Sequence, residues 1–430
     1  MIGIVVSRAD EASVHVGEHL LAETDWRAVE PGVYRTEGFE LREFEERHLH
    51  LEGVAEAFEN PDCVVFASRH SGETGRLLSA HFTGNFGEAE LGGADRDLAT
   101  PCPTAHKRAI HALADHAPEG WDVAMECTHH GPTSVGAPSM FVELGSSEAQ
   151  WTDPAGARAV ARAILDLGGE RERDRRRVVG FGGNHYAPRP TRLLRETGVA
   201  FGHVAADWSL DDLGDPGEHE ALIESAFETS GASLAVFDGE YPEVERVVED
   251  LGYRVVSETW LRETDGRSID LIEALEGSMA TVEEGLRFGQ RTADPGELVI
   301  ETLDEDLVAT LLGIDDEATL TAVDRHAVAY ETDENGNRLA DTAAFPGETA
   351  YRAFVDEALE ILADSYDDVT RSGNDVVAER TTFDPAAARA AGVPEGPKFG
   401  ALAAGEAVTV DGETVRPDQM ETTEIREFTV

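Results

Sequence analysis

The sequence predicts an α/β protein with a three-layer architecture, in which helices cover both faces of a mainly parallel sheet. Short apolar runs alternate with stretches of helical periodicity up to about residue 280, and this alternation is typical of such a sheet. Helix start signals stand between the runs, as at Asp153-Pro154. With 430 residues and a hydrophobic content of 41%, the chain is long enough for two or three domains with a sizeable core.

The individual elements follow from this pattern. Apolar runs predict β-strands over 2–6, 63–67, 77–82, 123–127, 140–144, 178–181, 201–205 and 234–237. Capping signals predict helices over 104–116, 154–167 and 242–251, the second of them ended by Gly168-Gly169. The stretch 169–177 is predicted to be a charged loop.

The character of the chain changes after about Glu276. We predict a main domain over 1–280 and an acidic α+β extension over 281–430. Within the extension we expect a strand over 322–330, a hairpin turn over 333–337 and a helix over 349–364.

The charge balance is strongly acidic, with 86 acidic against 35 basic residues and a formal net charge of -51. The acidic residues are spread along the whole chain, which favours adaptation to a salt-rich cytoplasm over a basic partner, because salt screens their repulsion. This balance does not exclude a nucleic-acid partner, since binding to nucleic acid depends on a local patch of arginines rather than on the net charge. Three cysteines without framework spacing suggest a reducing cytosol. No apolar run approaches the length of a membrane span, and the first residues predict a strand rather than a signal peptide.

The segment Glu126-Cys127-Thr128-His129-His130-Gly131-Pro132 follows an apolar run and carries the strongest chemical signal. A carboxylate and two adjacent imidazoles at a strand end suggest proton transfer, metal binding or both. The alternative is that one histidine packs inside while the other faces solvent. A covalent role for Cys127 is disfavoured, because strand alternation is expected to turn it away from the face that carries Glu126.

Further polar residues follow other predicted strands, and strands lying side by side would bring these ends to one edge of a sheet. Each has an ordinary alternative: Gly182-Gly183 as a turn, His81 and His203 as packed core residues, Ser146 as a helix cap, and Arg69 and Arg189 as surface charges. So many polar strand ends in one domain favour a shared site. The candidates are Arg69, His70, His81, Glu143, Ser146, Gly182, Gly183, Asn184, His185 and Arg189.

At four of these segments the chain resembles the archaeal and plant-type D-aminoacyl-tRNA deacylases. The segments are 68–73 (Ser-Arg-His-Ser-Gly-Glu), 126–133 (Glu-Cys-Thr-His-His-Gly-Pro-Thr), 142–148 (Val-Glu-Leu-Gly-Ser-Ser-Glu) and 183–189 (Gly-Asn-His-Tyr-Ala-Pro-Arg). The resemblance covers most of residues 1–280. A short motif at 392–400 is similar to the terminal region of tRNase-Z-type nucleases, but the similarity is too short to indicate a function.

The resemblance implies hydrolysis of the ester between a D-amino acid and the 3′ end of tRNA, which removes mischarged tRNA. It also implies a fold related to the peptidyl-tRNA hydrolase and phosphorylase class, two zinc ions per subunit, and a cytoplasmic monomer. No stable protein partner and no membrane are expected.

The site hypothesis combines this implication with the residues. The activating group for ester hydrolysis would be His130 or a metal-bound water, and Glu126 would orient it. His129 would lie beside them as a catalytic residue and a metal ligand. His70, His81, His129 and His185 are the metal-ligand candidates. Backbone amides around Gly131 or Gly182-Gly183 would supply the oxyanion site. Arg69 and Arg189, with Lys107 and Arg108, would hold tRNA phosphates, and the remaining substrate contacts would be Glu143, Ser146 and Asn184.

Two other functions fit the same residues. One is a metal-dependent peptidase or amidohydrolase acting on a small substrate. The other is a non-catalytic tRNA-binding protein, which the shortage of lysine and of interleaved aromatic residues disfavours. The sequence leaves open which D-amino acids are accepted, how L-aminoacyl-tRNA is rejected, whether the zinc is catalytic or structural, and what the extension does.

Overall fold

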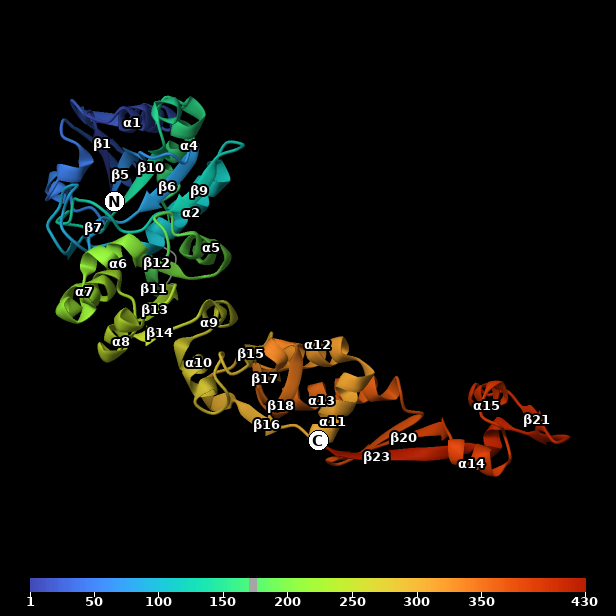
Figure 1. The fold of residues 1–430 in the computed structure, drawn as a ribbon. Helices are drawn as coiled ribbons and strands as arrows, with labels where there is room; N and C mark the ends of the chain where they lie inside the picture. Colours follow the sequence, from blue (N-terminus) through green and yellow to red (C-terminus); the bar gives the residue numbers. More distant parts are fainter. Residues whose placement is uncertain (170–175) are drawn as a thin grey trace. The chain divides into compact units, whose positions relative to one another are not determined.

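The computed structural model describes residues 1–169 and 176–430 and divides the chain into two compact units, Met1–Asp265 and Gly266–Val430 (Figure 1). The predicted α/β class is confirmed. The division lies at Asp265, before helix α10 (Ile269–Glu276), rather than near residue 280. Most of the predicted loop over 169–177 lies outside the described residues.

The first unit contains an eight-stranded mixed sheet with the order β2-β3-β4-β1-β5-β10-β6-β9. Its centre is parallel from β4 through β1 and β5 to β10, whereas β6 runs antiparallel to β10 and parallel to β9. The strands are β1 (Ile2–Ser7), β2 (Arg27–Glu30), β3 (Val33–Thr36), β4 (Phe39–Phe44), β5 (Cys63–Arg69), β6 (Leu77–His81), β9 (Asp122–Met125) and β10 (Ser139–Gly145).

Three helices that contact one another pack on this sheet: α1 (Glu11–Glu23), α2 (Pro103–His116) and α4 (Pro154–Leu165). Asp10 and Asp153 cap α1 and α4 by accepting backbone N–H groups of the first turn, as short acidic side chains at the N-cap do. A second apolar cluster contains Phe66 and Phe141, whose rings stack at 4.5 Å beneath the short 3-10 helices His48–His50 and Val54–Ala57.

A second, fully parallel sheet completes the first unit in the order β12-β11-β13-β14. Helix α2 contacts both β6 and β12, so it joins the two sheets. The strands and helices of this half are β11 (Arg177–Gly182), α5 (Pro188–Glu196), β12 (Ala200–Ala205), α6 (Asp207–Leu213), α7 (Glu220–Ser230), β13 (Leu234–Asp238), α8 (Pro242–Asp250), β14 (Arg254–Val255) and α9 (Glu258–Glu263).

All eight predicted strands of this unit are present, and the predicted helices correspond to α2, α4 and α8. Helix α1 and the hairpin strands β2 and β3 were not predicted. Strand β2 is exposed along its whole length, so it lacks the apolar signal that marks the buried strands.

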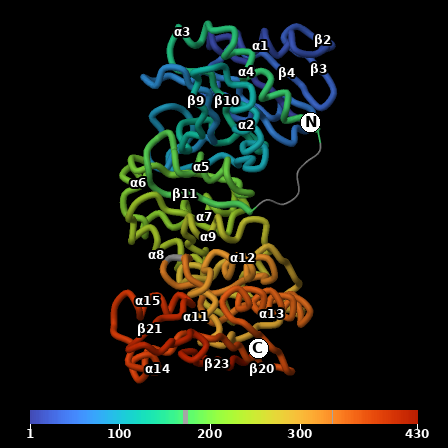
Figure 2. The backbone as a smooth tube through the Cα atoms, turned by 90° about the vertical axis from the view of Figure 1, so that its right-hand side faces the viewer, coloured from blue at the N-terminus to red at the C-terminus, as the bar shows by residue number. Residues whose placement is uncertain are grey.

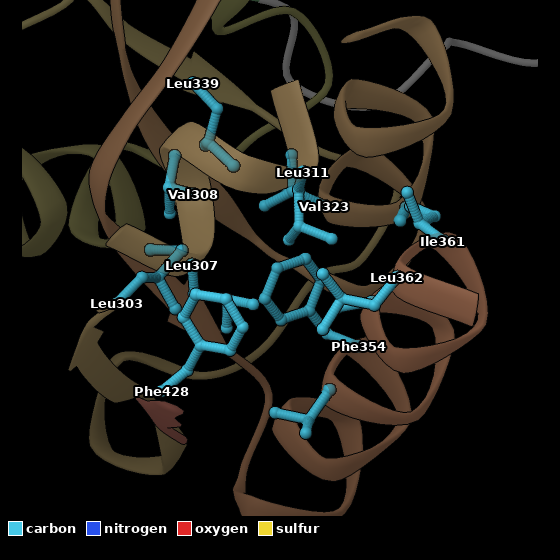
Figure 3. Close-up of a cluster of buried hydrophobic side chains, with 14 of the residues drawn as sticks. Leu303, Leu307, Val308, Leu311, Val323, Leu339, Phe354, Ile361, Leu362 and Phe428 are labelled. Carbon is cyan, nitrogen blue, oxygen red and sulfur yellow. The ribbon is translucent and has the colours of Figure 1, made fainter. Parts of the chain in front are cut away.

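The second unit is built on an antiparallel sheet with the order β15-β17-β18-β16, covered by helices whose apolar side chains form one core (Figure 3). The expected strand over 322–330 is wrong in its first half, because Asp315 caps a helix that buries Ala322 and Val323. The hairpin turn is confirmed between β17 and β18, and α13 confirms the predicted helix. The elements are β15 (Leu286–Phe288), β16 (Val299–Thr302), α11 (Glu305–Ile314), α12 (Asp316–His326), β17 (Ala329–Asp333), β18 (Arg338–Phe345) and α13 (Glu348–Ala363).

The last part of this unit is a long antiparallel pair that carries a small module of its own. Strands β20 and β23 pair along their whole length. The segment between them contains α14, α15 and β21 (Figure 2) and forms a separate apolar cluster that includes Leu402 and Met420. The elements are β19 (Asp368–Ser372), β20 (Asp375–Phe383), α14 (Pro385–Ala390), α15 (Pro397–Ala403), β21 (Val408–Val410), β22 (Glu413–Val415) and β23 (Glu421–Thr429).

Across the described residues, every helix is too short or too polar to cross a membrane.

The assignment of Lys107 and Arg108 to tRNA phosphates is wrong. Lys107 is buried on α2, and its ammonium donates to the carbonyl oxygens of Leu194, Thr197 and Val199 at the end of α5. Arg108 donates to the carbonyls of residues 166 and 168. Sequence alone does not distinguish a buried lysine that satisfies carbonyls from an exposed one.

We expect Lys107→Ala to lower the free energy of unfolding by about 3 kcal/mol, because three buried carbonyls lose their donor and a cavity remains. Urea unfolding in high salt measures the change. Arg195→Ala, an exposed position on α5, is the matched control and should change stability by less than about 0.5 kcal/mol. A Lys107→Ala protein as stable as this control would show that the three carbonyls do not depend on the ammonium.

Candidate functional site

The candidate site lies on one face of the first sheet, around the middle of β10. Glu143 opposes Ser68 of β5 and Ser79 of β6, and Phe141 opposes His81. Because side chains two residues apart share a face of a strand, His81, Phe141 and Glu143 are on the same side. The expectation that the strand ends share one edge is therefore wrong. Strand β6 runs antiparallel to β10, and β11–β14 form a separate sheet.

The loop that follows β9 is held between the two sheets of this unit. The Glu126 amide donates to Ala80 O of β6 at 3.0 Å, and the Thr128 amide donates to Val204 O of β12 at 2.8 Å. His203 is fully buried and hydrogen-bonded at both ring nitrogens, to Thr128 Oγ1 and to a backbone carbonyl. It is a satisfied core residue that supports this loop.

Three imidazoles face one another with the same tautomer. His81, His129 and His130 each place Nδ1 2.8–3.0 Å from a backbone carbonyl, to which it donates. This bond fixes the proton on Nδ1 and leaves Nε2 as the free lone pair. The ring centroids lie 4.2–4.9 Å apart. One ligand atom from each lies within 4.8 Å of the other two, a spacing that suits a metal ion.

Two buried carboxylates, Glu126 and Glu143, complete the cluster. Glu126 Oε2 lies 2.9 Å from His185 Nε2, and its Oε1 lies 3.1 Å from His70 Nδ1. Glu143 lies 3.6 Å from His70 and 3.7 Å from His81. Glu126 approaches His129 at 3.8 Å. Its close partners are thus His185 and His70, whereas His130 is oriented by the carbonyl of Gly131.

These contacts set the charges. Burial alone would raise the pKa of Glu126 and Glu143, but the neighbouring imidazoles lower the pKa of both carboxyls. Burial opposes the charge on His70, yet the two carboxylates raise its pKa to about 10. Burial lowers the pKa of His130 to about 4 and the pKa of His129 well below its ordinary value. At neutral pH the metal-free site therefore holds ionised carboxylates beside a protonated His70, while His129 and His130 are neutral.

Two buried atoms at the centre of this cluster lack a hydrogen-bond partner among the described residues. They are His81 Nε2 and Glu126 Oε1, although the latter is in ion-pair contact with His70 at 3.1 Å. An unsatisfied buried polar atom costs about 1–3 kcal/mol, so such atoms call for an explanation. A cation fits both, because a neutral imidazole nitrogen and a carboxylate oxygen are metal ligands. A second group, His70 with the two carboxylates, and a third, Cys127 with His129 and His185, also have metal-ligand spacing.

Cys127, Glu126 and His185 are arranged like a nucleophile, an acid and the base between them. Cys127 Sγ lies 3.5 Å from His185 Nδ1, and Glu126 lies on the other ring nitrogen. The thiol is nevertheless fully buried, and burial raises its pKa above the ordinary value. The thiolate is the reactive form, so this geometry suits a metal ligand better than a nucleophile.

A cavity of about 410 Å³ opens onto the cluster. Its buried wall contains Asp10, His48, His70, Phe141 and Glu143, and His129, His130 and His185 also line it. The cavity is large enough for an aminoacyl group with part of a nucleotide and is lined by both acidic and basic groups. The arrangement can therefore bind a polar ester and supply a neutral base next to it.

The remaining predicted residues divide into two sets. Arg69 lines the cavity with its guanidinium 4.8 Å over the Trp151 ring, and Ser146 is buried with its hydroxyl bonded to Thr74. The others shape the turn that carries His185. A side chain at Gly182 would collide with Asp238 O, and Asn184 accepts the Tyr186 amide. The guanidinium of Arg189 forms ion pairs with Asp238 and Glu258 and donates a hydrogen bond to Phe237 O.

Several residues of the cavity were missed from the sequence. Asp10 caps helix α1 after β1, and His48 begins the 3-10 helix after β4. Tyr186, beside the cavity, places its hydroxyl 3.4 Å from His70 Nε2. Cys127 contributes to a possible ligand set. Tyr186 could have been predicted as a site residue, because it directly follows His185 in the sequence. No sequence spacing connects Asp10 or His48 with the histidine motif.

Comparisons with known proteins agree on one family. A model of the family described as D-aminoacyl-tRNA deacylase matches residues 57–256. The D-aminoacyl-tRNA deacylase of Halobacterium salinarum is 53% identical over 427 residues, covering 99% of this chain and 94% of the relative. That of Haloarcula marismortui is 48% identical over 451 residues and covers both chains fully. That of Methanoregula boonei is 34% identical over 387 residues, covering 89% of this chain and 88% of the relative.

A solved crystal structure supports the fold of the first unit. It belongs to a conserved protein of unknown function, is 31% identical and superposes with a TM-score of 0.57. The match covers 63% of this chain and 99% of the other.

His203 predicts a pH dependence of stability. Burial lowers its pKa from 6.5 to about 4 in the folded protein, so folding favours its neutral form. Its contribution is complete above pH 6.5 and is lost as the pH falls toward 4, up to about 3 kcal/mol. Urea unfolding between pH 7.5 and 4 should show a shallower loss for His203→Gln than for the native chain. His50→Gln, at an exposed position, should follow the native curve. Identical slopes for all three proteins would contradict the assignment.

Proposed function

The chain belongs to the D-aminoacyl-tRNA deacylase family, and we propose that its histidine-lined cavity hydrolyses the ester of D-aminoacyl-tRNA. The products are free tRNA and a D-amino acid, so the enzyme removes mischarged tRNA. One observation carries this proposal. The polar residues of the family-like segments come from β5, β9, β10 and the turn after β11, and they converge on one cavity. Full-length relatives with this activity in their names support the same conclusion.

Ester hydrolysis needs an activated water and donors for the developing oxyanion. We assign water activation to His130, whose neutral Nε2 can accept a proton while Nδ1 stays bonded to Gly131 O. Glu126 holds His185 at 2.9 Å and His70 at 3.1 Å. His70 carries a positive charge in the metal-free site, and the Tyr186 hydroxyl beside it is placed to donate to an oxyanion.

We further propose that Arg69, Glu143 and Ser146 contact the substrate, while Gly182, Gly183 and Asn184 fix the turn that presents His185. The acidic wall of the cavity suits the α-ammonium group of the amino acid, because Asp10 and Glu143 both line it. Arg189 stays a candidate for tRNA backbone contact, although an approaching phosphate would compete with Asp238 and Glu258.

We propose zinc as the metal, because sets of imidazole, carboxylate and thiol donors are typical zinc ligands. The groups Cys127–His129–His185 and His70–Glu126–Glu143 share no residue, which is compatible with two ions and leaves Nε2 of His130 free to act as the base. A zinc ion at this position supplies Lewis-acid chemistry, polarising a carbonyl and lowering the pKa of water. His129 belongs to two of the possible ligand groups, whereas His130 belongs to one.

We also propose that the protein works as a monomer in the cytoplasm of a salt-rich cell. The formal net charge of -51 supports the halophilic setting, and the similar proteins from Halobacterium and Haloarcula agree with it. Scattering or gel filtration in molar salt tests the oligomeric state.

We expect His130→Ala to slow deacylation of D-aminoacyl-tRNA by 10²–10⁴-fold, on the order of what a general base contributes. The protein should keep its fold, because His130 donates to a neighbouring carbonyl rather than to a distant element. Release of labelled D-amino acid from tRNA in high salt measures the rate, and His50→Ala is the control. Full activity of His130→Ala would remove this residue from the mechanism.

Removal of the metal should abolish deacylation and lower the melting temperature. Without a cation, the carboxylates of Glu126 and Glu143 are neutralised by protonated imidazoles, so metal binding must displace protons. We therefore expect chelation to become easier as the pH falls toward 5. Zinc added back should restore both activity and melting temperature. Unchanged turnover after complete chelation, verified by metal analysis, would contradict a functional metal.

The same assay separates the alternative functions. An amidohydrolase would turn over small D-aminoacyl amides faster than D-aminoacyl-tRNA, and a binding protein would retain charged tRNA without releasing amino acid.

A further inference from the structure

The mouth of the cavity carries an arginine that the mechanism does not use. Arg47 lines the cavity together with Arg69, yet it is exposed, whereas Asp10, His48, His70 and Glu143 are buried. The exposed residues define the entrance and the buried ones the floor. Arg47 thus stands where the part of a substrate that extends out of the cavity must pass.

The backbone on both sides of Arg47 is fixed. The Ser7 hydroxyl donates to Glu46 O at 2.7 Å, and the buried His48 ring lies 3.2 Å from Ser13 Oγ. The Arg47 carbonyl accepts the amide of His50 at 3.1 Å. The backbone at Arg47 is therefore held by strand β1 and helix α1 rather than by a loose loop.

Arg47 has no ion pair or hydrogen-bonding partner for its guanidinium among the described residues, although the chain carries a large acidic excess. Of the three acidic residues just before it, Glu43 and Glu45 are bound by Arg8, and the described residues show no ion pair between Glu46 and Arg47. Arg69 is held weakly, with Nε 4.0 Å from Asp10 and its plane over Trp151. Two incompletely neutralised guanidinium groups at one entrance favour an anion, and their fork geometry suits a phosphate.

An apolar surface adjoins these arginines. Leu49 and Leu91 line the same cavity, and Leu91 is 59% exposed. Its loop is rigidly placed, because Asn85 donates to the carbonyls of Gly92 and Ala94 at 3.0 Å and because Gly92 packs directly on Leu49 O. An exposed leucine in a fixed loop beside two arginines offers an apolar contact next to a phosphate site.

We propose that this entrance binds the 3′-terminal nucleotide of the tRNA, with its 5′-phosphate on Arg47 and Arg69 and its base against Leu49 and Leu91. This inference rests on the proposed function and assigns the substrate orientation. The phosphate lies at the arginine-lined entrance, and the ester extends inward to His130. Arg47 is then a binding residue that selects esters of nucleotides over simple esters.

The test compares Arg47→Ala with native protein on two substrates, D-aminoacyl-tRNA and a D-aminoacyl nucleoside ester that lacks the 5′-phosphate. We expect KM for the tRNA to rise about tenfold with kcat within about twofold, and no change with the nucleoside ester. The salt dependence of kcat/KM for the tRNA should weaken by about 0.7 in the log–log slope, as for one lost phosphate contact. Arg47→Lys should recover part of the loss, and Arg27→Ala, an exposed arginine on β2, should behave like native protein.

Equal losses on both substrates, or no loss on either, would overturn the inference. A binding measurement keeps it distinct from the proposed function. Calorimetry with a nucleoside 5′-monophosphate and with its nucleoside should show tighter binding of the phosphate form to native protein, and Arg47→Ala should remove that difference. Such binding without any hydrolysis of D-aminoacyl-tRNA would overturn the proposed function and leave the nucleotide site standing. No difference between the two ligands on native protein would reject the site itself.

Discussion

The burial of two carboxylates in one cluster of imidazoles is the constraint around which the first unit is built. Glu126 and Glu143 are almost completely excluded from solvent, and an isolated buried carboxylate is very costly. Their charges are tolerated because His70, His81 and His185 approach them within hydrogen-bonding or ion-pair distance. Removing one partner of such a cluster leaves an uncompensated charge. The cluster is therefore sensitive to any loss of a partner.

The fold supplies these partners from distant segments by pressing two sheets against one loop. The loop after β9 is bonded on one side to β6 and on the other to β12, with His203 buried behind it. The turn after β11 then brings His185 to Glu126, and the Cys127 amide bonds to His185 O at 2.9 Å. The geometry of the candidate site consequently depends on the packing of both sheets, which α2 joins and which Lys107 strengthens at the end of α5.

The cavity is polarised from its entrance to its floor. Arginines and two leucines, one of them exposed, lie at the entrance, a neutral histidine pair lies in the middle, and carboxylates lie inside. An aminoacyl-tRNA ester has the same order. It carries an anionic nucleotide at one end, an uncharged carbonyl in the centre and the ammonium group of the amino acid at the other end. The overall charge of the protein opposes binding of tRNA, so local arginines without acidic partners gain importance. In a salt-rich solution such short-range contacts persist better than long-range attraction.

The sequence by itself determined the α/β class, eight of the strands of the first unit and the residue types of the site, because buried strands and capped helices leave periodic signals over short distances. The His129-His130 motif and the resemblance at four segments also pointed to the family. Tertiary structure decided the rest. Strand direction placed Glu143 and His81 on a sheet face instead of a common edge, and Lys107 binds three buried carbonyls. Asp10, Arg47 and His48 line the cavity from the segments that follow β1 and β4, and their spacing in the sequence gives no sign of it. These outcomes depend on which strands pair and which side chains are buried, and such long-range choices leave no local pattern in the chain.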